Sequence, residues 1–130
     1  MPPATQHNKR LGQLGETIAT QFLESLGYRI LVRNWRYGRL GELDVIARDE
    51  DNNTRVIVEV KTRRSRRYGL PIEALTPAKQ AQLLAVAEAY LADNPLTPEE
   101  SVRFDVISVG LKDKDPDGLA ARVDHHINVL

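Results

Sequence analysis

Two short stretches of this chain place charged side chains inside otherwise apolar segments. GELDVIA carries Glu42 and Asp44 among aliphatic residues, and VIVEVKT carries Glu59 and Lys61 in a run of β-branched residues. Two carboxylates about 4 Å apart repel by roughly 1 kcal/mol in water and by about 4 kcal/mol at an effective dielectric of 20. Acids in segments that read as buried sheet therefore need a positive partner, either Lys61 or a divalent cation.

These residue types suit metal-assisted phosphodiester hydrolysis. Mg²⁺ prefers oxygen ligands, is held by one or two carboxylates, and keeps waters and phosphate in its remaining positions. A bound ion polarises the phosphate and acidifies a water, while an amine can orient or deprotonate that water. Alternate residues of a strand share a face, so Glu59 and Lys61 are neighbours, and Asp44 joins them if the two segments pair. The alternatives are an ion pair on a solvated sheet face for Glu59 and Lys61, and a turn cap for Asp44.

The segments around these residues predict two helices and five strands. Apolar residues recur at three- and four-residue spacing from Leu11 to Leu26, which is typical of an amphipathic helix, and Gly27 is placed to end it. Thr76 and Pro77 supply an N-cap and a first-turn proline for a second helix. Its predicted apolar face comprises Leu83, Leu84, Ala87, Tyr90 and Leu91. Strands are predicted over residues 28–37, 40–48, 54–62, 102–109 and 122–129.

Alternation along GELDVIA predicts which side chains share a face. One face is expected to hold Glu42, Asp44 and Ile46, and the other Leu43, Val45 and Ala47.

The order α, β, β, β, α, β, β predicts an α/β fold in which helices flank one mixed sheet of about five strands. At 130 residues the chain is the size of one domain, so we expect a single domain over 1–130, with 1–10 as a flexible N-terminal tail. There is no cysteine, hence no disulfide framework and no thiolate zinc site. Because the sequence shows neither the apolar core of a signal peptide nor a run of about 18 apolar residues, we expect a cytoplasmic protein that does not associate with membranes.

The charges are balanced overall but unevenly distributed, with 18 basic and 18 acidic side chains. Residues 29–67 hold eleven Lys or Arg and six Asp or Glu, a balance of +5, whereas residues 68–100 hold one basic and five acidic residues, a balance of −4. A basic face would attract polyanions such as nucleic acid. Most charge runs are simply solvated surface, so the charge pattern alone leaves both interpretations open.

The spacing of the charged residues also resembles a known superfamily. Asp44, then fourteen residues, then Glu59-Val60-Lys61, with Glu16 upstream, resembles the PD-(D/E)xK nucleases. More narrowly, five ordered blocks resemble the small bacterial YraN-like family, which is similar to archaeal Holliday-junction resolvases: GETIATQFLESLGYRILVRNWR, GELDVIA, VIVEVKTR, YGLPIEALTPAKQ and RFDVISV. A lone ExK triplet arises easily by chance, whereas an ordered set of blocks is specific.

The resemblance implies a restriction-endonuclease-like core with a Mg²⁺ or Mn²⁺ site. Asp44 and Glu59 would hold the metal, Glu16 would be a further ligand, Lys61 would be the catalytic amine, and Gln80 would support the site from the following helix. Leucine replaces the proline that precedes the first aspartate in the wider superfamily, as it does in the narrower family. The alternatives are an exposed helix residue for Glu16 and a satisfied core amide for Gln80.

Asp105, within RFDV, is predicted to pair with a basic side chain such as Arg36 or Arg39 and lies outside the proposed catalytic set.

The segment TRRSRRYG, directly after Lys61, predicts contact with a phosphate backbone and strongly salt-dependent binding. Trp35, Tyr37 or Tyr68 could stack on an unpaired base, and core packing is the alternative for Trp35. The alternative for the arginines is a charged surface loop. No recognition-helix pattern is present, so readout of backbone and shape is expected. The residues predicted to contact DNA are Arg36, Arg39, Arg63, Arg64, Arg66, Arg67 and Tyr68.

Taken with the resemblance, the sequence predicts a Mg²⁺- or Mn²⁺-dependent endonuclease acting on structured or branched DNA, in junction resolution, repair or recombination, with DNA expected rather than RNA. One alternative is a nucleic-acid-binding accessory module on the same fold that does not cut. Another is an adaptor whose basic face docks an acidic protein. The intact acids and lysine favour the enzyme. Because a junction resolvase needs two active sites, the resemblance also implies a homodimer, although no segment predicts its interface.

Overall fold

The computed structural model describes residues 4–65, 75–112 and 121–130. It contains the predicted helices and strands in the predicted order, which confirms the α/β class. The elements are α1 (Ala4–Ser25), β1 (Arg29–Tyr37), β2 (Gly41–Asp49), β3 (Thr54–Ser65), α2 (Pro77–Asp93), β4 (Ser101–Lys112) and β5 (Arg122–His126).

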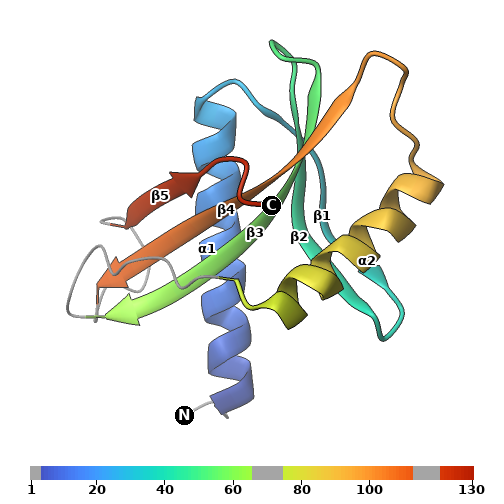
Figure 1. Ribbon diagram of the computed structural model, residues 1–130. Coiled ribbons are helices and arrows are strands. Elements are labelled where there is room, and N and C mark those ends of the chain that lie inside the picture. The colour runs from blue at the N-terminus through green and yellow to red at the C-terminus, as the bar shows by residue number, and fades with distance from the viewer. Residues whose placement is uncertain (1–3, 66–74, 113–120) are drawn as a thin grey trace.

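The strands form one mixed sheet in the order β1-β2-β3-β4-β5. β3 and β4 are parallel and the other neighbouring strands are antiparallel. Parallel neighbours need a long crossover connection, and α2 lies within that connection. α1 covers one face of the sheet and α2 the other, as Figure 1 shows. The protein therefore has three layers, and β2 and β3 are buried on both faces.

A separate hydrophobic core lies on each side of the sheet. The core under α1 includes Ala19, Leu23, Val45, Ala47, Val56, Val58, Ile107 and Val109. The core under α2 includes Leu43, Ile46, Ile57, Leu83, Val86, Ala87 and Tyr90. This two-sided burial explains why the central strands read as nearly continuous apolar runs.

The predicted helix faces are wrong at two leucines. Leu84 is 44% exposed, because the buried face of α2 follows the 83, 86, 87, 90 pattern and turns Val86 inward instead. Leu26 is 53% exposed, because α1 ends at Ser25 and the chain has already left the helix there.

The helix ends follow local sequence signals, with one exception. Thr76 Oγ1 accepts a hydrogen bond from the backbone N–H of Lys79, and Pro77 begins α2, as predicted. Gly27 follows α1 with φ of +91°, a conformation that favours glycine. Where a flexible tail is predicted over 1–10, the structure has helix from Ala4 onward. No glycine or proline interrupts residues 4–11, so nothing in the sequence prevents the helix from extending.

A buried polar network fastens the C-terminal residues to β4. The Asp105 carboxylate accepts hydrogen bonds from Arg103 Nε at 3.1 Å and from the backbone N–H of Asn128 at 3.0 Å, and it lies 2.8 Å from His125 Nε2. Burial would raise the pKa of Asp105, but the hydrogen bonds from His125 and Arg103 hold that pKa below its ordinary value.

Asp105 does pair with a basic side chain, as predicted, but that side chain is Arg103, and the suggested partners Arg36 and Arg39 are wrong. Asp105 lies on β4, whereas Arg36 lies on β1 and Arg39 directly follows it, and β2 and β3 separate these strands in the sheet.

Among the residues that the structure describes, no helix combines the length and apolar character needed to cross a membrane.

Candidate metal centre

The candidate site forms where β2 and β3 stop pairing. The last pair of their ladder is Val45 with Val58, and beyond it the two strands diverge, as Figure 1 shows. Asp44 is the next residue of β2. Its Oδ2 accepts a hydrogen bond from the backbone N–H of Val60 at 2.8 Å. The carboxylate of Asp44 therefore occupies the opening between the two strands.

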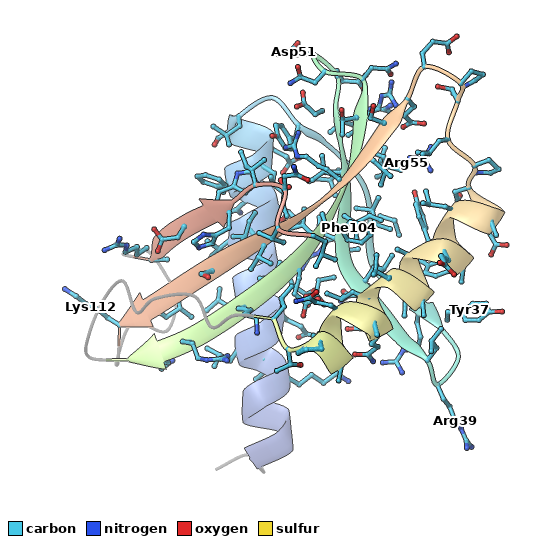
Figure 2. The ribbon with its side chains drawn as sticks, in the orientation of Figure 1. Tyr37, Arg39, Asp51, Arg55, Phe104 and Lys112 are labelled. Atoms are coloured by element: carbon cyan, nitrogen blue, oxygen red, sulfur yellow. The ribbon has the colours of Figure 1, made fainter. Side chains whose placement is uncertain are left out.

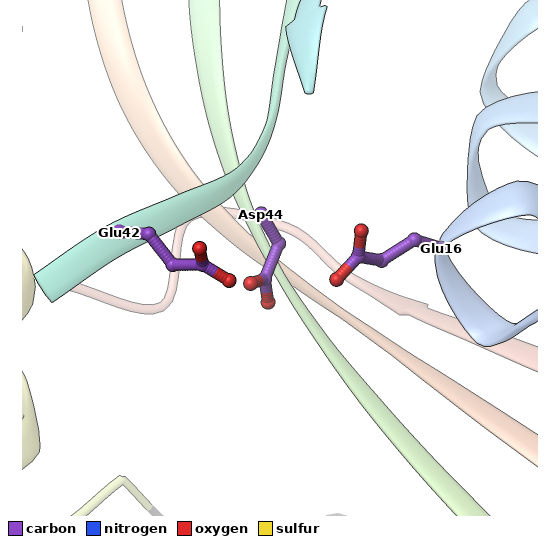
Figure 3. Close-up of side chains that lie close together, drawn as sticks. All are labelled: Glu16, Glu42 and Asp44. Atoms are coloured by element: carbon purple, nitrogen blue, oxygen red, sulfur yellow. The ribbon is translucent and has the colours of Figure 1, made fainter. Parts of the chain in front are cut away.

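Three carboxylates converge at this opening (Figure 3). Glu16 comes from α1, and Glu42 and Asp44 come from β2. One oxygen atom from each of the three lies within 4.8 Å of the others. Carboxylate oxygens are the ligands that hard divalent cations such as Mg²⁺ and Mn²⁺ prefer. The cluster can therefore hold such an ion.

Glu42 was not among the residues predicted for the site. Its position two residues before Asp44 in a strand was the available signal, because alternate residues share a face. The alternation of GELDVIA predicts that Glu42 shares a face with Asp44, but the resemblance assigns no role to this position.

The predicted alternation of GELDVIA is wrong at Leu43. Leu43 packs beside Ile46 in the core under α2, whereas Val45 and Ala47 pack under α1. Two residues three positions apart cannot share a face in a regular strand. The regular alternation is therefore interrupted between them, and Asp44 lies at the interruption.

Asp44 has no salt bridge with any residue in the described part of the chain. The pKa of this carboxyl group is raised from 3.8 to about 8, chiefly by burial and further by the nearby carboxylates of Glu59, Glu16 and Glu42. The hydrogen bond from Val60 opposes this shift. The anionic form of Asp44 is thus unfavourable in the absence of a cation, and a divalent cation would stabilise it.

Glu59 and Lys61 flank Val60 on β3 at the edge of this opening, and Glu59 is not among the three clustered carboxylates. Glu59 and Lys61 alternate with Val58 and Val60, which pack toward α1, and this directs them to the α2 side. There Lys79 Nζ, on the first turn of α2, lies 3.5 Å from Glu59 Oε1. Burial raises the pKa of Glu59, and the ammonium groups of Lys79 and Lys61 oppose the shift. Lys61 forms no salt bridge with the residues that the structure describes.

Glu16 and Glu42 each have a basic side chain beside them. Asn34 Nδ2 donates a 2.8 Å hydrogen bond to Glu16 Oε1, and Arg33 Nη2 lies 3.8 Å from the same oxygen. Arg36 Nη2 lies 3.3 Å from Glu42 Oε2. Burial raises the pKa of Glu16, with Asn34 and Arg33 acting in the opposite direction. The two glutamates thus have polar side-chain partners, whereas the hydrogen bond that Asp44 accepts within the described residues comes from a backbone N–H.

Gly15 allows α1 to approach β3 closely enough for Glu16 to reach the cluster. A Cβ atom at Gly15 would lie 1.8 Å from Thr62 Oγ1 and 2.8 Å from Thr62 Cβ. Any side chain would therefore push the helix away from the strand. Glu16 follows immediately in the sequence, so its position depends on this contact.

Within the described residues, Gln80 makes no hydrogen bond to a carboxylate of the cluster. Its Nε2 donates a 2.9 Å hydrogen bond to the backbone carbonyl of Leu75, just before α2. Its neighbour Lys79 forms the salt bridge between α2 and Glu59.

Four of the residues predicted to contact DNA belong to the described part of the chain. Arg39, in the turn between β1 and β2, points away from the sheet in Figure 2. Arg64 Nη1 donates to the carbonyl of Lys112 at 2.8 Å, and Arg63 Nη1 to the carbonyl of Thr62 at 3.0 Å. Arg36 is the salt-bridge partner of Glu42. The other three predicted contacts lie outside the described residues: Arg66, Arg67 and Tyr68.

Trp35 belongs to the core. It packs edge-on against Tyr90, with ring centroids 5.4 Å apart, and stacks on Tyr37 at 6.2 Å. Tyr37 is 52% exposed and Trp35 is partly buried, so Tyr37 is the more exposed ring of this stacked pair.

The fold and the site together define a small three-layer α/β protein with a carboxylate cluster at a split in its sheet. Residues 15–109 match the family described as "Uncharacterised protein family UPF0102", and this chain belongs to that family. It is the YraN-like family that the sequence blocks resemble.

Relatives match along most of their length. A UPF0102 protein of Pelobacter propionicus is 45% identical over 127 residues, which cover 98% of this chain and 86% of the relative. A UPF0102 protein of Symbiobacterium thermophilum is 49% identical over 111 residues, covering 85% and 88% respectively. A UPF0102 protein of Geobacter sulfurreducens is 44% identical over 126 residues, covering 97% and 92%.

Proposed function

We propose that this protein is a Mg²⁺- or Mn²⁺-dependent endonuclease that hydrolyses phosphodiester bonds in structured or branched DNA. The main support is the convergence of Glu16, Glu42 and Asp44, one oxygen of each within 4.8 Å of the others, at an opening in the sheet. The resemblance to junction resolvases supplies the substrate class. Resolution of a junction would need two such sites, so a homodimer is part of the proposal.

The donor set fits a hard divalent cation. Asp44, Glu59 and Glu16 would hold the ion, with Glu42 as a further carboxylate at the same opening. The carboxylates are half-buried and close together, and Asp44 forms no salt bridge within the described residues, so its anionic form is unfavourable and a divalent cation would stabilise it. When bound, such an ion polarises a phosphoryl oxygen and lowers the pKa of a bound water.

Lys61 is the proposed catalytic amine. It follows Glu59 by two residues on the same face of β3, so its ammonium group projects on the side of the opening where Glu59 lies. In hydrolysis the water oxygen bonds to phosphorus, the bond from phosphorus to the leaving oxygen breaks, and that oxygen gains a proton. The amine of Lys61 would orient the water and offset the negative charge that develops on the phosphate.

Basic side chains around the opening would hold the DNA backbone. Arg36 lies beside Glu42, and Arg63 and Arg64 follow Lys61 on β3. Contacts of this kind favour backbone and shape over base sequence. The proposed set is completed by Arg39, Arg66, Arg67 and Tyr68.

Cleavage of a labelled four-way DNA junction tests the proposal. Matched duplex and single strands are incubated alongside it with Mg²⁺ or Mn²⁺, and the wild type is compared with Glu59→Ala. Glu88→Ala is the matched control, because Glu88 is an exposed acid on α2. We expect metal-dependent nicking of the junction by the wild type and the control, and loss of nicking in Glu59→Ala.

Two results would separate the alternatives. Equal DNA binding by wild type and Glu59→Ala, with no cleavage under either metal, would exclude catalysis by the isolated protein and favour the non-cutting accessory module. Absence of both metal affinity and preference among DNA substrates would favour the adaptor that docks an acidic protein.

A further inference from the structure

Asn34 occupies an unusual position in β1. Its φ is +54°, in the left-handed region that residues other than glycine rarely adopt and that asparagine tolerates better than most. The β1–β2 ladder pairs the residues on either side of Asn34 with Val45 and Leu43, and it omits Asn34 and Asp44 between them. The distortion in β1 therefore lies directly opposite the acid at the centre of the candidate site.

This backbone conformation changes the direction of the Asn34 side chain. Val32 and Trp35 both pack in the core under α2, although they are three residues apart. Regular alternation would place Asn34 on the same face as Val32, away from α1. Instead, Arg33 and Asn34 both hydrogen-bond to residues of α1.

The amide of Asn34 fixes one oxygen of Glu16. Asn34 Nδ2 lies 2.8 Å from Glu16 Oε1, and the bond is between an uncharged donor and a carboxylate. It therefore orients the carboxylate without neutralising it. Within the described residues, Oε2 accepts no hydrogen bond, and it remains available to a cation.

Arg33 competes for the same carboxylate. Its Nη2 lies 3.8 Å from Glu16 Oε1, too far for a hydrogen bond but close enough for attraction. A guanidinium group can take both oxygens of a carboxylate at once, which would withdraw them from other ligands. Glu16 thus has two possible partners on β1. The uncharged amide of Asn34 leaves the negative charge of Glu16 available to a cation, whereas the guanidinium group of Arg33 would neutralise it.

We propose that Asn34 is a positioning residue that holds Glu16 toward Asp44 and keeps the 3.8 Å salt bridge with Arg33 from tightening into a hydrogen-bonded, bidentate pair. The left-handed backbone is what allows a strand residue to reach α1 at this point. This inference rests on the proposed function, in which Glu16 is a ligand of the catalytic cation.

Two substitutions separate the amide from the backbone conformation. Asn34→Gly retains the left-handed conformation and removes the amide. Asn34→Asp retains the size of the side chain but replaces the donor with a second carboxylate facing Glu16. Asn128→Gly is the matched control: Asn128 also has a positive φ, of +59°, and is exposed near the C-terminus.

The first measurement is the affinity of the full chain for Mn²⁺ alone, by isothermal titration or electron paramagnetic resonance. Loss of a residue that orients a metal ligand typically weakens metal binding about 10- to 100-fold. We expect a loss in that range for Asn34→Gly and none for Asn128→Gly. The loss in Asn34→Asp should be smaller than in Asn34→Gly, because the added carboxylate raises the charge of the cluster while the donor to Glu16 is lost. Wild-type affinity in Asn34→Gly would overturn the inference and leave the proposed function intact.

Crystal structures of the wild type and Asn34→Gly without metal provide a second readout. We expect Glu16 in the variant to turn to Arg33 and approach it more closely than the 3.8 Å of the native arrangement. A Glu16 carboxylate that still faces Asp44 in the variant would overturn the inference. If the wild type binds no Mn²⁺, the metal-dependent function fails, and these structures alone decide the role of Asn34.

Discussion

The backbone N–H of Val60 in β3 donates a 2.8 Å hydrogen bond to Asp44 Oδ2 in β2. In a regular antiparallel ladder such a donor would bond to a backbone carbonyl of the neighbouring strand. Here a side-chain carboxylate takes the place of that carbonyl, and the strands separate. The opening in the sheet and the position of the acid are therefore one structural feature.

Because the pKa of Asp44 is raised in the folded protein, the metal-free protein should lose stability as the pH rises. The pKa of this carboxyl group is 3.8 ordinarily and about 8 in the folded protein, so between these values the folded state holds a proton that the unfolded state has released. The free energy of unfolding should then fall by up to about 1.4 kcal/mol per pH unit for this group. Urea unfolding at about pH 5 and about pH 8 measures the change.

Asp44→Asn is the control for this prediction. Its side-chain oxygen can still accept the hydrogen bond from Val60, but it does not titrate. We expect the pH dependence between about 4 and 8 to flatten, and the variant to be more stable than the metal-free wild type at the upper end of that range. Equal pH profiles for the two proteins would contradict the prediction.

Gly15→Ala should separate α1 from β3. The added methyl group would lie 1.8 Å from Thr62 Oγ1, so the helix must move, and overpacking of this kind typically destabilises a protein by about 1–3 kcal/mol. Because Glu16 follows directly, its metal affinity should fall as well. Urea unfolding and Mn²⁺ titration measure the two effects.

Gly12→Ala is the matched control on the same helix. A Cβ atom at Gly12 would meet nothing within 4 Å, so alanine should stabilise the helix by roughly 0.5–1 kcal/mol. Combining Gly15→Ala with Thr62→Ala should recover part of the stability, because alanine at position 62 has no Oγ1 to meet the added methyl group. No recovery would show that the two residues do not interact as described.

Glu42→Gln tests the carboxylate that the sequence interpretation did not include. If Glu42 contributes its charge to the site, Mn²⁺ affinity should fall by about tenfold or more, because the number of charged ligands sets the affinity of such sites. Glu24→Gln, at an exposed position on α1, should bind Mn²⁺ as the wild type does. Unchanged affinity in Glu42→Gln would mean that Glu42 does not contribute its charge to the metal site and acts through its salt bridge with Arg36.

The arginines after Lys61 should determine the salt dependence of DNA binding. Each phosphate that the protein no longer neutralises should lower the slope of log affinity against log salt by about 0.9 on duplex DNA. Replacing Arg63 and Arg64 together by alanine should therefore reduce the slope by roughly one to two. Arg29→Ala is the control. Arg29 is the first residue of β1 and forms a salt bridge with Glu50, so it does not belong to the segment after Lys61. An equal reduction in the control would mean that general charge, and not this segment, governs binding.

The elements of the fold could be predicted because their signals are local. Thr76 and Pro77 mark the start of α2 by their own chemistry, and Gly27 follows α1 for the same reason. The order of elements then limits the sheet to a small set of topologies. The partners of Asp105 were predicted wrongly because they depend on which strand lies beside β4. The sequence RFD nevertheless indicated one partner, because Arg103 lies two residues before Asp105 and therefore shares its face of the strand.

The candidate site could be predicted only in part. Glu16 and Asp44 were identified by residue type and resemblance, and the structure brings them together. The face of the sheet on which Leu43 packs could not be predicted, because it depends on a distortion that β2 shares with the neighbouring strand β1. The contact of Gly15 with Thr62 joins residues far apart in the sequence, and helical periodicity contains no information about it.

Asn34 and Asp44 lie opposite each other, and each interrupts the alternation of its own strand. Deleting either residue alone would shift the register of the hairpin by one position and turn the following side chains to the wrong face. Deleting both would leave Trp35 and Leu43 on the face they already occupy and restore alternation at this point, while the separate irregularity between Ile30 and Val32 would remain. Asn34 and Asp44 thus behave as one extra residue in each strand, and their effects on the register cancel. One supplies the amide and the other the carboxylate. The scaffold and its chemistry are thus separable, and we expect the doubly shortened chain to melt cooperatively while each singly shortened chain does not.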